Sequence, residues 1–180
     1  MASNILPRVM FTVLCILAVH IFPDSQAAAN QDLYQVRQLN QKVIALYRAH
    51  KYEEAVPLAT KALSLMDWVR TPNPVVFVQT LNNLAELKRK TGDFVVAETL
   101  LLRSLKTSVQ FLGETHSSVA IICNNLALIY ENLKKFPEAE ALYQRSLKIR
   151  EKNLGANHPK VITLVHKLAV LIKKRSQLNM

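Results

Sequence analysis

The stretch CNNLALIYENLKKF, residues 123–136, contains a tetrapeptide that the chain uses twice. NNLA occurs at 82–85 and returns, at a 42-residue spacing, at 124–127. Two neighbouring asparagines are unexpected in a segment with helical apolar spacing, because asparagine is among the poorer helix formers. Their return after a fixed interval indicates an internal repeat in which the asparagines occupy defined positions.

The same 42-residue shift aligns other residue types along most of the chain, without insertions. A constant period of this length predicts stacked supersecondary units, each of which buries its apolar face only against its neighbours. The aligned columns are Tyr52, Phe94 and Phe136; Ala55, Ala97 and Ala139; Leu63, Leu105 and Leu147; Leu84, Leu126 and Leu168; Ala85, Ala127 and Ala169; Gly113 and Gly155; and His116 and His158.

Each period resolves into two helices. In the third period, which matches the pattern best, we expect a first helix over 117–134, with Leu126, Ala127 and Tyr130 on one stripe, and a second helix over 137–154. Small side chains at Ala127 and Ala139 let the paired helices approach closely. Because the chain has only 3 glycines in 180 residues, a turn-rich β design is disfavoured and the pattern predicts an all-α fold.

The joints between periods carry signals for helix starts and ends. Asn73, Thr115 and Asn157 form one column before each new first helix, where their side-chain oxygens are expected to cap free backbone N–H groups. Gly113 and Gly155 fit the left-handed position that ends the preceding helix. These residues predict a sharp boundary between one helix pair and the next.

Two segments resemble the tetratricopeptide repeat (TPR), more narrowly the 42-residue type of kinesin light chains and many bacterial repeat proteins. They are LNNLAELKRKTGDFVVAETLLLRSL at 81–105 and NNLALIYENLKKFPEAEALYQRSLKIREKNLGANHPKV at 124–161. The resemblance implies a right-handed superhelical solenoid of antiparallel helix hairpins. Its repeats would cover 33–74, 75–116 and 117–158, followed by a half repeat or capping helix over 159–176. The first repeat departs from the pattern, since Lys42 and Val43 stand in the leucine and alanine columns.

In this family the first helices line a concave groove that holds a peptide, and asparagine amides there bond the ligand's backbone. Asn82, Glu86 and Arg89 share one helical face, turned away from the apolar stripe. Cations outnumber carboxylates in the groove set, which favours an acidic peptide. Alternatively, the asparagine pairs bond across adjacent first helices and fix their stacking. Carried over by register, the groove set is Asn40, Ile44, Tyr47, Arg48, Asn82, Asn83, Glu86, Arg89, Lys90, Asn124, Asn125, Leu128, Glu131, Asn132, His166, Val170, Lys173 and Lys174.

The N-terminal segment 1–29 differs from the rest of the chain. Arg8 precedes an apolar run over 9–22, and the small residues of DSQAAAN follow, so this segment has the pattern of a secretory signal peptide cleaved after Ala27 or Ala29. An uncleaved membrane anchor is the competing interpretation, although the run is shorter than the roughly 18–20 residues that a span requires. The protein is therefore expected to be exported, either periplasmic or secreted.

After removal of segment 1–29, Cys123 is the single cysteine, so no internal disulfide is expected and we interpret the thiol as a small buried apolar group. The formal net charge of the whole chain is +10, and removing Arg8 and Asp24 together leaves it unchanged. A basic domain favours anionic partners such as acidic protein segments, lipid headgroups or nucleic acid. Export argues against nucleic acid.

The sequence contains none of the HExxH, GxSxG, P-loop or dinucleotide-binding motifs, and no two histidines are spaced i, i+4. We therefore expect no catalytic residues, no cofactor and no metal site, and a non-catalytic scaffold that binds a protein or peptide. The alternative is a membrane-surface or self-association module acting through the basic C-terminal helix, because KLAVLIKKR at 167–175 alternates apolar and basic residues. A capping role for that helix accounts for the same pattern, and homo-oligomerisation stays open.

Overall fold

The computed structural model describes residues 23–68 and 73–178. Within these ranges it contains seven α-helices and no β-strand, which confirms the predicted all-α fold. The helices are α2 (Pro23–Arg48), α3 (Tyr52–Trp68), α4 (Pro74–Lys90), α5 (Phe94–Leu112), α6 (Ser117–Asn132), α7 (Phe136–Leu154) and α8 (Pro159–Leu178).

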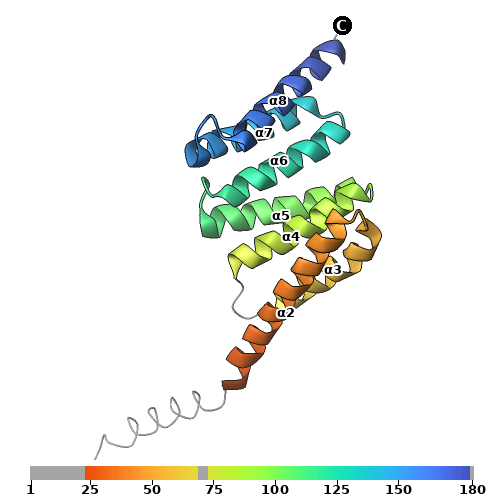
Figure 1. The fold of residues 1–180 in the computed structure, drawn as a ribbon, viewed down its shortest axis with the longest axis vertical. Coiled ribbons are helices and arrows are strands. Elements are labelled where there is room, and N and C mark those ends of the chain that lie inside the picture. Colours follow the sequence, from red (N-terminus) through yellow and green to blue (C-terminus); the bar gives the residue numbers. More distant parts are fainter. Residues whose placement is uncertain (1–22, 69–72, 179–180) are drawn as a thin grey trace, which may run out of the picture.

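The helices stack in sequence order from α2 to α8 as a row of antiparallel hairpins (Figure 1). Each helix packs mainly on its neighbours in the sequence, most extensively within the pairs α2–α3, α4–α5 and α6–α7. The first helices also touch across repeats, α2 against α4 and α4 against α6, whereas α6 and α8 approach each other less closely. This weaker joint opens a pocket that is described below.

Alanines lie at the centre of each hairpin core. Ala85 and Ala97 share one buried cluster in α4–α5, and Ala127 and Ala139 share another in α6–α7; all four are 0% exposed. In the first hairpin, Val43 takes the alanine position and is still buried, at 2% exposure. The predicted close approach of the paired helices is therefore present, and the first hairpin accommodates a larger side chain.

The predicted N-terminal cap is present at the start of α4 but not at the starts of α6 and α8. Asn73 caps α4, since its Oδ1 accepts from the backbone N of Val75 at 3.1 Å and of Val76 at 3.2 Å. At the later joints the cap lies one residue after the predicted threonine and asparagine: Nδ1 of His116 accepts from Ser118 N at 3.2 Å, and Nδ1 of His158 accepts from Lys160 N at 3.1 Å. The prediction for Thr115 and Asn157 was wrong because α6 and α8 begin one register position later than α4.

The turn inside each hairpin contains one residue with a positive φ. Gly92 takes this place between α4 and α5, at φ 84°, but His50 and Lys134 take it in the other two hairpins, both at φ 59°. For residues with a Cβ this conformation is strained by roughly 1–2 kcal/mol. Between repeats, Gly113 ends α5 at φ 91° and ψ 157°, so the predicted positive φ is present but with an extended ψ.

Most of the predicted signal peptide, residues 1–22, lies outside the described residues. The predicted cleavage positions, after Ala27 and after Ala29, fall within α2. None of the helices that the structure describes is both long and apolar enough to cross a bilayer.

Candidate functional site

A groove of about 410 Å³ runs across the first helices of three successive hairpins. We call it the amide groove, because three asparagines line it beside apolar side chains. Ile44 of α2 and Ile121 of α6 stand on opposite sides, and Ile121 is 48% exposed. Its lining consists of Val43, Ile44, Tyr47, Arg48, Asn82, Asn83, Glu86, Ile121 and Asn125.

The asparagines of the groove are also held by the protein itself. Asn82 donates from Nδ2 to Val78 O at 3.0 Å and to Ser104 Oγ at 3.2 Å, while its buried Oδ1 has no partner among the described residues. Asn125 Oδ1 accepts from Asn124 Nδ2 at 3.2 Å. The amides therefore have fixed orientations, and part of their hydrogen-bonding capacity remains unused.

Asn40 occupies a different place from the one predicted. It is 2% exposed, its Nδ2 donates to Thr80 Oγ1 at 2.8 Å, and its Oδ1 accepts from Asn83 Nδ2 at 3.3 Å. The side chain therefore lies between α2 and α4 and does not face the groove. The alternative interpretation, in which asparagines bond across adjacent first helices and fix their stacking, holds for this pair.

Glu86 is the carboxylate of the amide groove, and the protein itself neutralises it. Oε1 accepts from Tyr47 Oη at 2.7 Å and from Arg89 at 2.7 Å, while Oε2 accepts from Arg89 Nε at 2.9 Å. Tyr47 comes from α2 and Arg89 from α4, so the cluster links two repeats. A fork-shaped guanidinium contact of this kind is among the stronger side-chain interactions.

The pKa values in this cluster reflect the same contacts. Burial raises the pKa of Glu86, but the hydrogen bonds from Arg89 and Tyr47 and the charge of Arg89 outweigh it, and the net shift is downward. Burial, together with the hydrogen bond to the Glu86 carboxylate, raises the pKa of Tyr47 to about 12. At neutral pH the cluster therefore holds an ionised carboxylate and a protonated phenol.

Glu131 forms the corresponding cluster one repeat later. Its Oε1 accepts from Lys174 Nζ of α8 at 2.6 Å, and its Oε2 accepts from Tyr143 Oη of α7 at 3.3 Å. Burial and the nearby Glu131 carboxylate raise the pKa of Tyr143. Both carboxylates of the predicted groove set are thus bound by a cation and a phenol of the chain itself.

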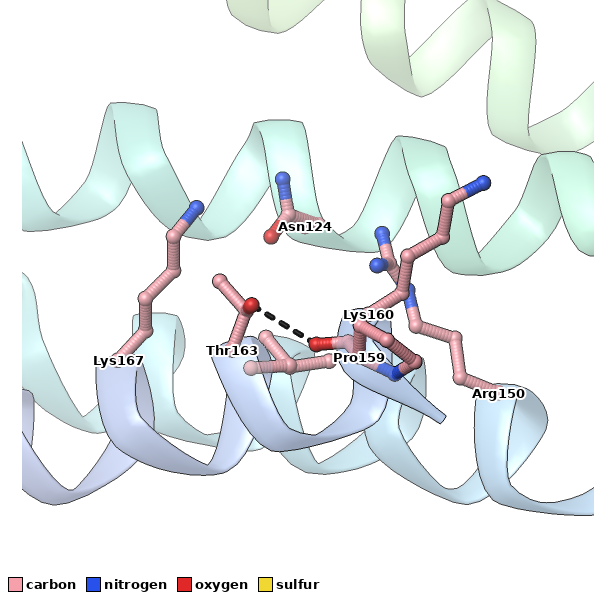
Figure 2. Close-up of a pocket in the computed structure, with 7 residues that line it drawn as sticks. Asn124, Arg150, Pro159, Lys160, Thr163 and Lys167 are labelled. Carbon is pink, nitrogen blue, oxygen red and sulfur yellow. Dashed lines mark hydrogen bonds between the residues drawn. The ribbon is translucent and has the colours of Figure 1, made fainter. Parts of the chain in front are cut away.

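A second hollow, of about 190 Å³, lies between α6 and α8, with α7 beneath it (Figure 2). We call it the basic pocket, because it contains Arg150, Lys160 and Lys167 and no carboxylate. Thr163 donates to Pro159 O at 2.8 Å inside it. The remaining lining residues are Asn124 and Leu164.

A third hollow, of about 390 Å³, lies next to the other two. It shares Ile121 with the amide groove and shares Arg150 and Lys160 with the basic pocket. Three neighbouring hollows therefore follow one another along the stack from α2 to α8.

The remaining predicted residues lie outside these hollows. Lys90 sits over the Tyr52 ring, with Nζ 5.7 Å from the ring centroid. Leu128 packs against the α6–α8 core, and Asn132 bonds Leu128 O of its own helix at 2.6 Å. His166, Val170 and Lys173 are exposed on α8.

Sequence reasoning missed Val43 and Ile121 in the amide groove and Arg150, Lys160 and Lys167 in the basic pocket. The register of the repeat offered a signal for Lys167, which aligns with Asn83 and Asn125. It offered none for Arg150, because that residue belongs to a second helix, and second helices were not expected to reach the concave side.

The described residues offer few side chains suited to nucleophilic or metal chemistry. Cys123 is buried, and burial raises the pKa of its thiol. Across residues 23–68 and 73–178, no three side chains of His, Cys, Asp or Glu gather in a way that could hold a metal ion.

Comparison with known families agrees with the arrangement of the hairpins. The sequence model of the tetratricopeptide repeat matches residues 78–118 and 119–160. Both segments are similar to tetratricopeptide repeats. Each matched TPR segment holds most of one first helix and all of the second helix that follows it. No curated protein matches the chain at a significant level.

Solved structures show the same fold. BtubC (BKLC) from P. vanneervenii has a TM-score of 0.68 and 24% identity, over 83% of this chain and 65% of that protein, which is less than two thirds of its length. Nearly identical TPR-like repeats assigned to a kinesin light chain of Podosopora anserina have a TM-score of 0.72 and 21% identity, over 82% of this chain and 70% of theirs. A single-substitution form of those repeats gives a TM-score of 0.71. The helical chain is thus similar to kinesin-light-chain-like TPR solenoids.

Proposed function

We propose that this protein is an exported, non-catalytic scaffold that binds an extended acidic peptide along the concave side of its TPR stack. TPR segments bind protein or peptide partners in the family that the chain resembles. The neighbouring hollows from α2 to α8 offer such a ligand both amides and apolar side chains. Asn83 Oδ1 and Asn125 Nδ2 form no hydrogen bond with a described residue, so the groove keeps an amide acceptor and an amide donor, which demand no particular side chain, for an extended backbone.

The charge distribution of the hollow carries the acidic preference. Glu86 is neutralised by Arg89, and Glu131 by Lys174, at 2.7 Å and 2.6 Å. Arg48, in the amide groove, forms no ion pair with any described residue. The cations of the basic pocket are unpaired in the same way. A ligand therefore meets an excess of positive charge, which favours carboxylates and speeds their association at low salt.

Binding of peptide pools tests this function. Acidic and basic pools of equal length are offered to the immobilised protein while salt is raised from about 0.05 M to about 0.5 M. We expect the acidic pool to be retained at low salt and released as salt rises. Equal retention of the two pools would reject the acidic preference.

A matched pair of variants locates the binding. Arg48→Glu reverses a charge in the amide groove, whereas Lys106→Glu makes the same change at an exposed position of the second helix α5. Groove binding predicts a loss of about tenfold in affinity for Arg48→Glu, because a close charge pair becomes a repulsion. The Lys106 variant should lose much less. Equal losses would indicate attraction by net charge alone.

The outer face of α8 supports a second candidate function, attachment to a membrane surface or to a second copy. Leu164 and Leu171 are buried against α7, but Ile162, Val165 and Ile172 are 58%, 47% and 41% exposed. The helix carries cations and no carboxylate. An amphipathic basic face of this kind is typical of helices that lie on anionic lipid.

Flotation with anionic liposomes separates the two functions. A Val165→Asp, Ile172→Asp variant should lose flotation if the α8 face binds lipid, while retention of the acidic peptide pool should stay unchanged. Sedimentation of the same variant tests pairing of two copies. If neither flotation nor self-association occurs in the wild type, this second function is rejected.

A further inference from the structure

The joint between α6 and α8 lacks the hydrogen bonds that close the joint between α2 and α4. In the earlier joint, Asn40 donates to Thr80 and accepts from Asn83. The equivalents of these residues two periods later are Asn124, Leu164 and Lys167, and all three line the basic pocket. Leucine and lysine in place of threonine and asparagine cannot form the same closed set of bonds, so a hollow remains here, although Lys174 and Glu131 bridge α8 and α6 further along.

Arg150 does not follow the packing pattern of its own column. The equivalent positions in the two preceding periods hold Ser108 and Met66, which are buried core positions. Arg150 is half-buried and extends from α7 toward the opening between α6 and α8 (Figure 2). The charge at this position is therefore not part of the repeat's ordinary core.

The three cations of the basic pocket have no counter-charge. Arg150, Lys160 and Lys167 form no ion pair with any residue that the structure describes. Burial lowers the pKa of Arg150, which shows that its guanidinium is partly removed from water without a compensating carboxylate. Three unpaired cations around one hollow repel each other, and an anion between them would relieve both that repulsion and the lost solvation.

The size of the basic pocket limits what can enter. About 190 Å³ holds an oxyanion of phosphate or carboxylate size with a few waters, each of which takes about 30 Å³ in the liquid. It cannot hold a length of peptide. A guanidinium offers two parallel donors to such an oxyanion. Lys167 stands across the opening from Arg150, with Asn124 between them, and the Lys160 side chain extends outward past Arg150 (Figure 2).

We propose that the basic pocket binds an oxyanion carried by the peptide ligand, either an acidic side chain or a phosphate ester. The inference rests on the proposed function for the source of the anion. The third hollow lies next to both sites, because it shares Ile121 with the amide groove and Arg150 and Lys160 with the basic pocket. A peptide lying across Ile121 therefore brings its next residues to the three cations.

The first arm of the test uses inorganic phosphate alone with the full chain. Phosphate is titrated at constant ionic strength and followed by amide NMR shifts and by the melting temperature. We expect saturable shifts centred on α8 and the end of α7. Arg150→Gln should weaken phosphate binding by about tenfold, the loss expected for a charge-assisted hydrogen-bonded contact. Lys148→Gln, an exposed change on the same helix, should leave it unchanged.

The second arm uses the acidic peptide pool, and a matched pool that carries phosphoserine, with the same variants and a Lys167→Gln variant. Loss of both phosphate and pool binding in Arg150→Gln, with an unchanged melting temperature, supports the proposal. No saturable phosphate effect in the wild type would overturn it. If Arg150→Gln loses phosphate but keeps both pools, the peptide is not the source of the oxyanion. Loss of the phosphoserine pool alone identifies a phosphate ester as the source. If the wild type binds phosphate but never the acidic pool, the proposed function fails while the pocket stands.

If the Arg150→Gln variant does not fold, phosphate and peptide binding are compared between the wild type and Lys167→Gln instead. It removes one cation of the same pocket from a helix with an otherwise exposed outer face. Arg150→Lys adds a geometric check, since lysine keeps the charge but not the paired donors. Phosphate affinity intermediate between the wild type and Arg150→Gln is expected, and affinity equal to the wild type would reject the guanidinium contact.

Discussion

Asn83 of α4 donates from Nδ2 to Oδ1 of Asn40 of α2 at 3.3 Å, and the same Asn40 donates to Thr80 at 2.8 Å. One buried amide therefore satisfies both its donor and its acceptor across the joint between two repeats. The stacking of the first two hairpins depends on this polar contact as well as on apolar burial, and α6–α8 has no equivalent.

Asn40→Ala should destabilise the fold by about 1–3 kcal/mol, because it removes two bonds and leaves Thr80 and Asn83 without their partner. Urea unfolding followed by circular dichroism measures the change. Gln41→Ala is the matched control, since Gln41 is the next residue on α2 and is exposed. A loss no larger than that of the control would show that the amide contact contributes nothing to stability.

Glu86→Gln should lower the free energy of unfolding by about 1–3 kcal/mol near neutral pH, because it removes the charge that Arg89 and Tyr47 bind. The folded-state pKa of Glu86 is depressed, so its contribution is complete above the ordinary carboxyl pKa and is lost as pH falls through the folded pKa. The difference between wild type and variant should therefore shrink as pH falls from about 7 to about 3.

Denaturant unfolding at several pH values provides the measurement for Glu86, with Glu151→Gln as an exposed control on α7. The control should differ from the wild type by no more than about 0.5 kcal/mol. If the free energies of unfolding of the wild type and of Glu86→Gln differ by the same amount at every pH, the assigned role of the ionised carboxylate is contradicted.

Ala139→Leu should destabilise the α6–α7 hairpin by about 1–3 kcal/mol through overpacking, because Ala139 is 0% exposed and shares a cluster with Ala127. Ala141→Leu adds the same atoms at an exposed position on α7 and should have little effect. Thermal unfolding of the two variants gives the comparison. Similar melting temperatures for Ala139→Leu and Ala141→Leu would mean that the hairpin core accommodates a leucine at position 139 without strain.

Lys134→Gly should stabilise the protein by about 0.5–1 kcal/mol. The relief of a left-handed residue with a Cβ, about 1–2 kcal/mol, exceeds the entropy cost of glycine, about 0.5–1 kcal/mol. The converse change, Gly92→Ala, places a Cβ at φ 84° and should destabilise by a similar amount, although no atom lies within 4 Å of the new Cβ. Chemical denaturation of both variants tests the pair, and a stabilised Gly92→Ala would refute the argument.

Much of the fold could be predicted from local pattern. The helix expected over 117–134 runs Ser117–Asn132, and the one expected over 137–154 runs Phe136–Leu154. Such agreement is possible because apolar periodicity and helix caps act over a few residues. The caps at His116 and His158 were not predicted, because aligning the repeats at 42 residues does not reveal that a helix begins one residue later.

The candidate site was predictable only in outline. Tyr47, Arg48, Asn82, Asn83, Glu86 and Asn125 do line the amide groove, because all stand on one face of a first helix. Asn40 does not, since Thr80 and Asn83 of the next helix enclose it. Whether a polar side chain faces a groove or a neighbouring helix depends on which residues stand opposite, and these are about one period away.

The sequence by itself determined the repeat, the helix pairs and the alanines of their cores, because these follow from the helical periodicity and the 42-residue period, both of which can be read along the chain. Only the tertiary structure decided the partners of the groove charges. Tyr47 reaches Glu86 and Lys174 reaches Glu131 from about one period away, and both carboxylates are thereby removed from the surface charge that a ligand meets. It also decided that α6 and α8 leave a hollow between Asn124 and Lys167 and that Arg150 lies at its opening, because those outcomes depend on how side chains of three helices fill one space.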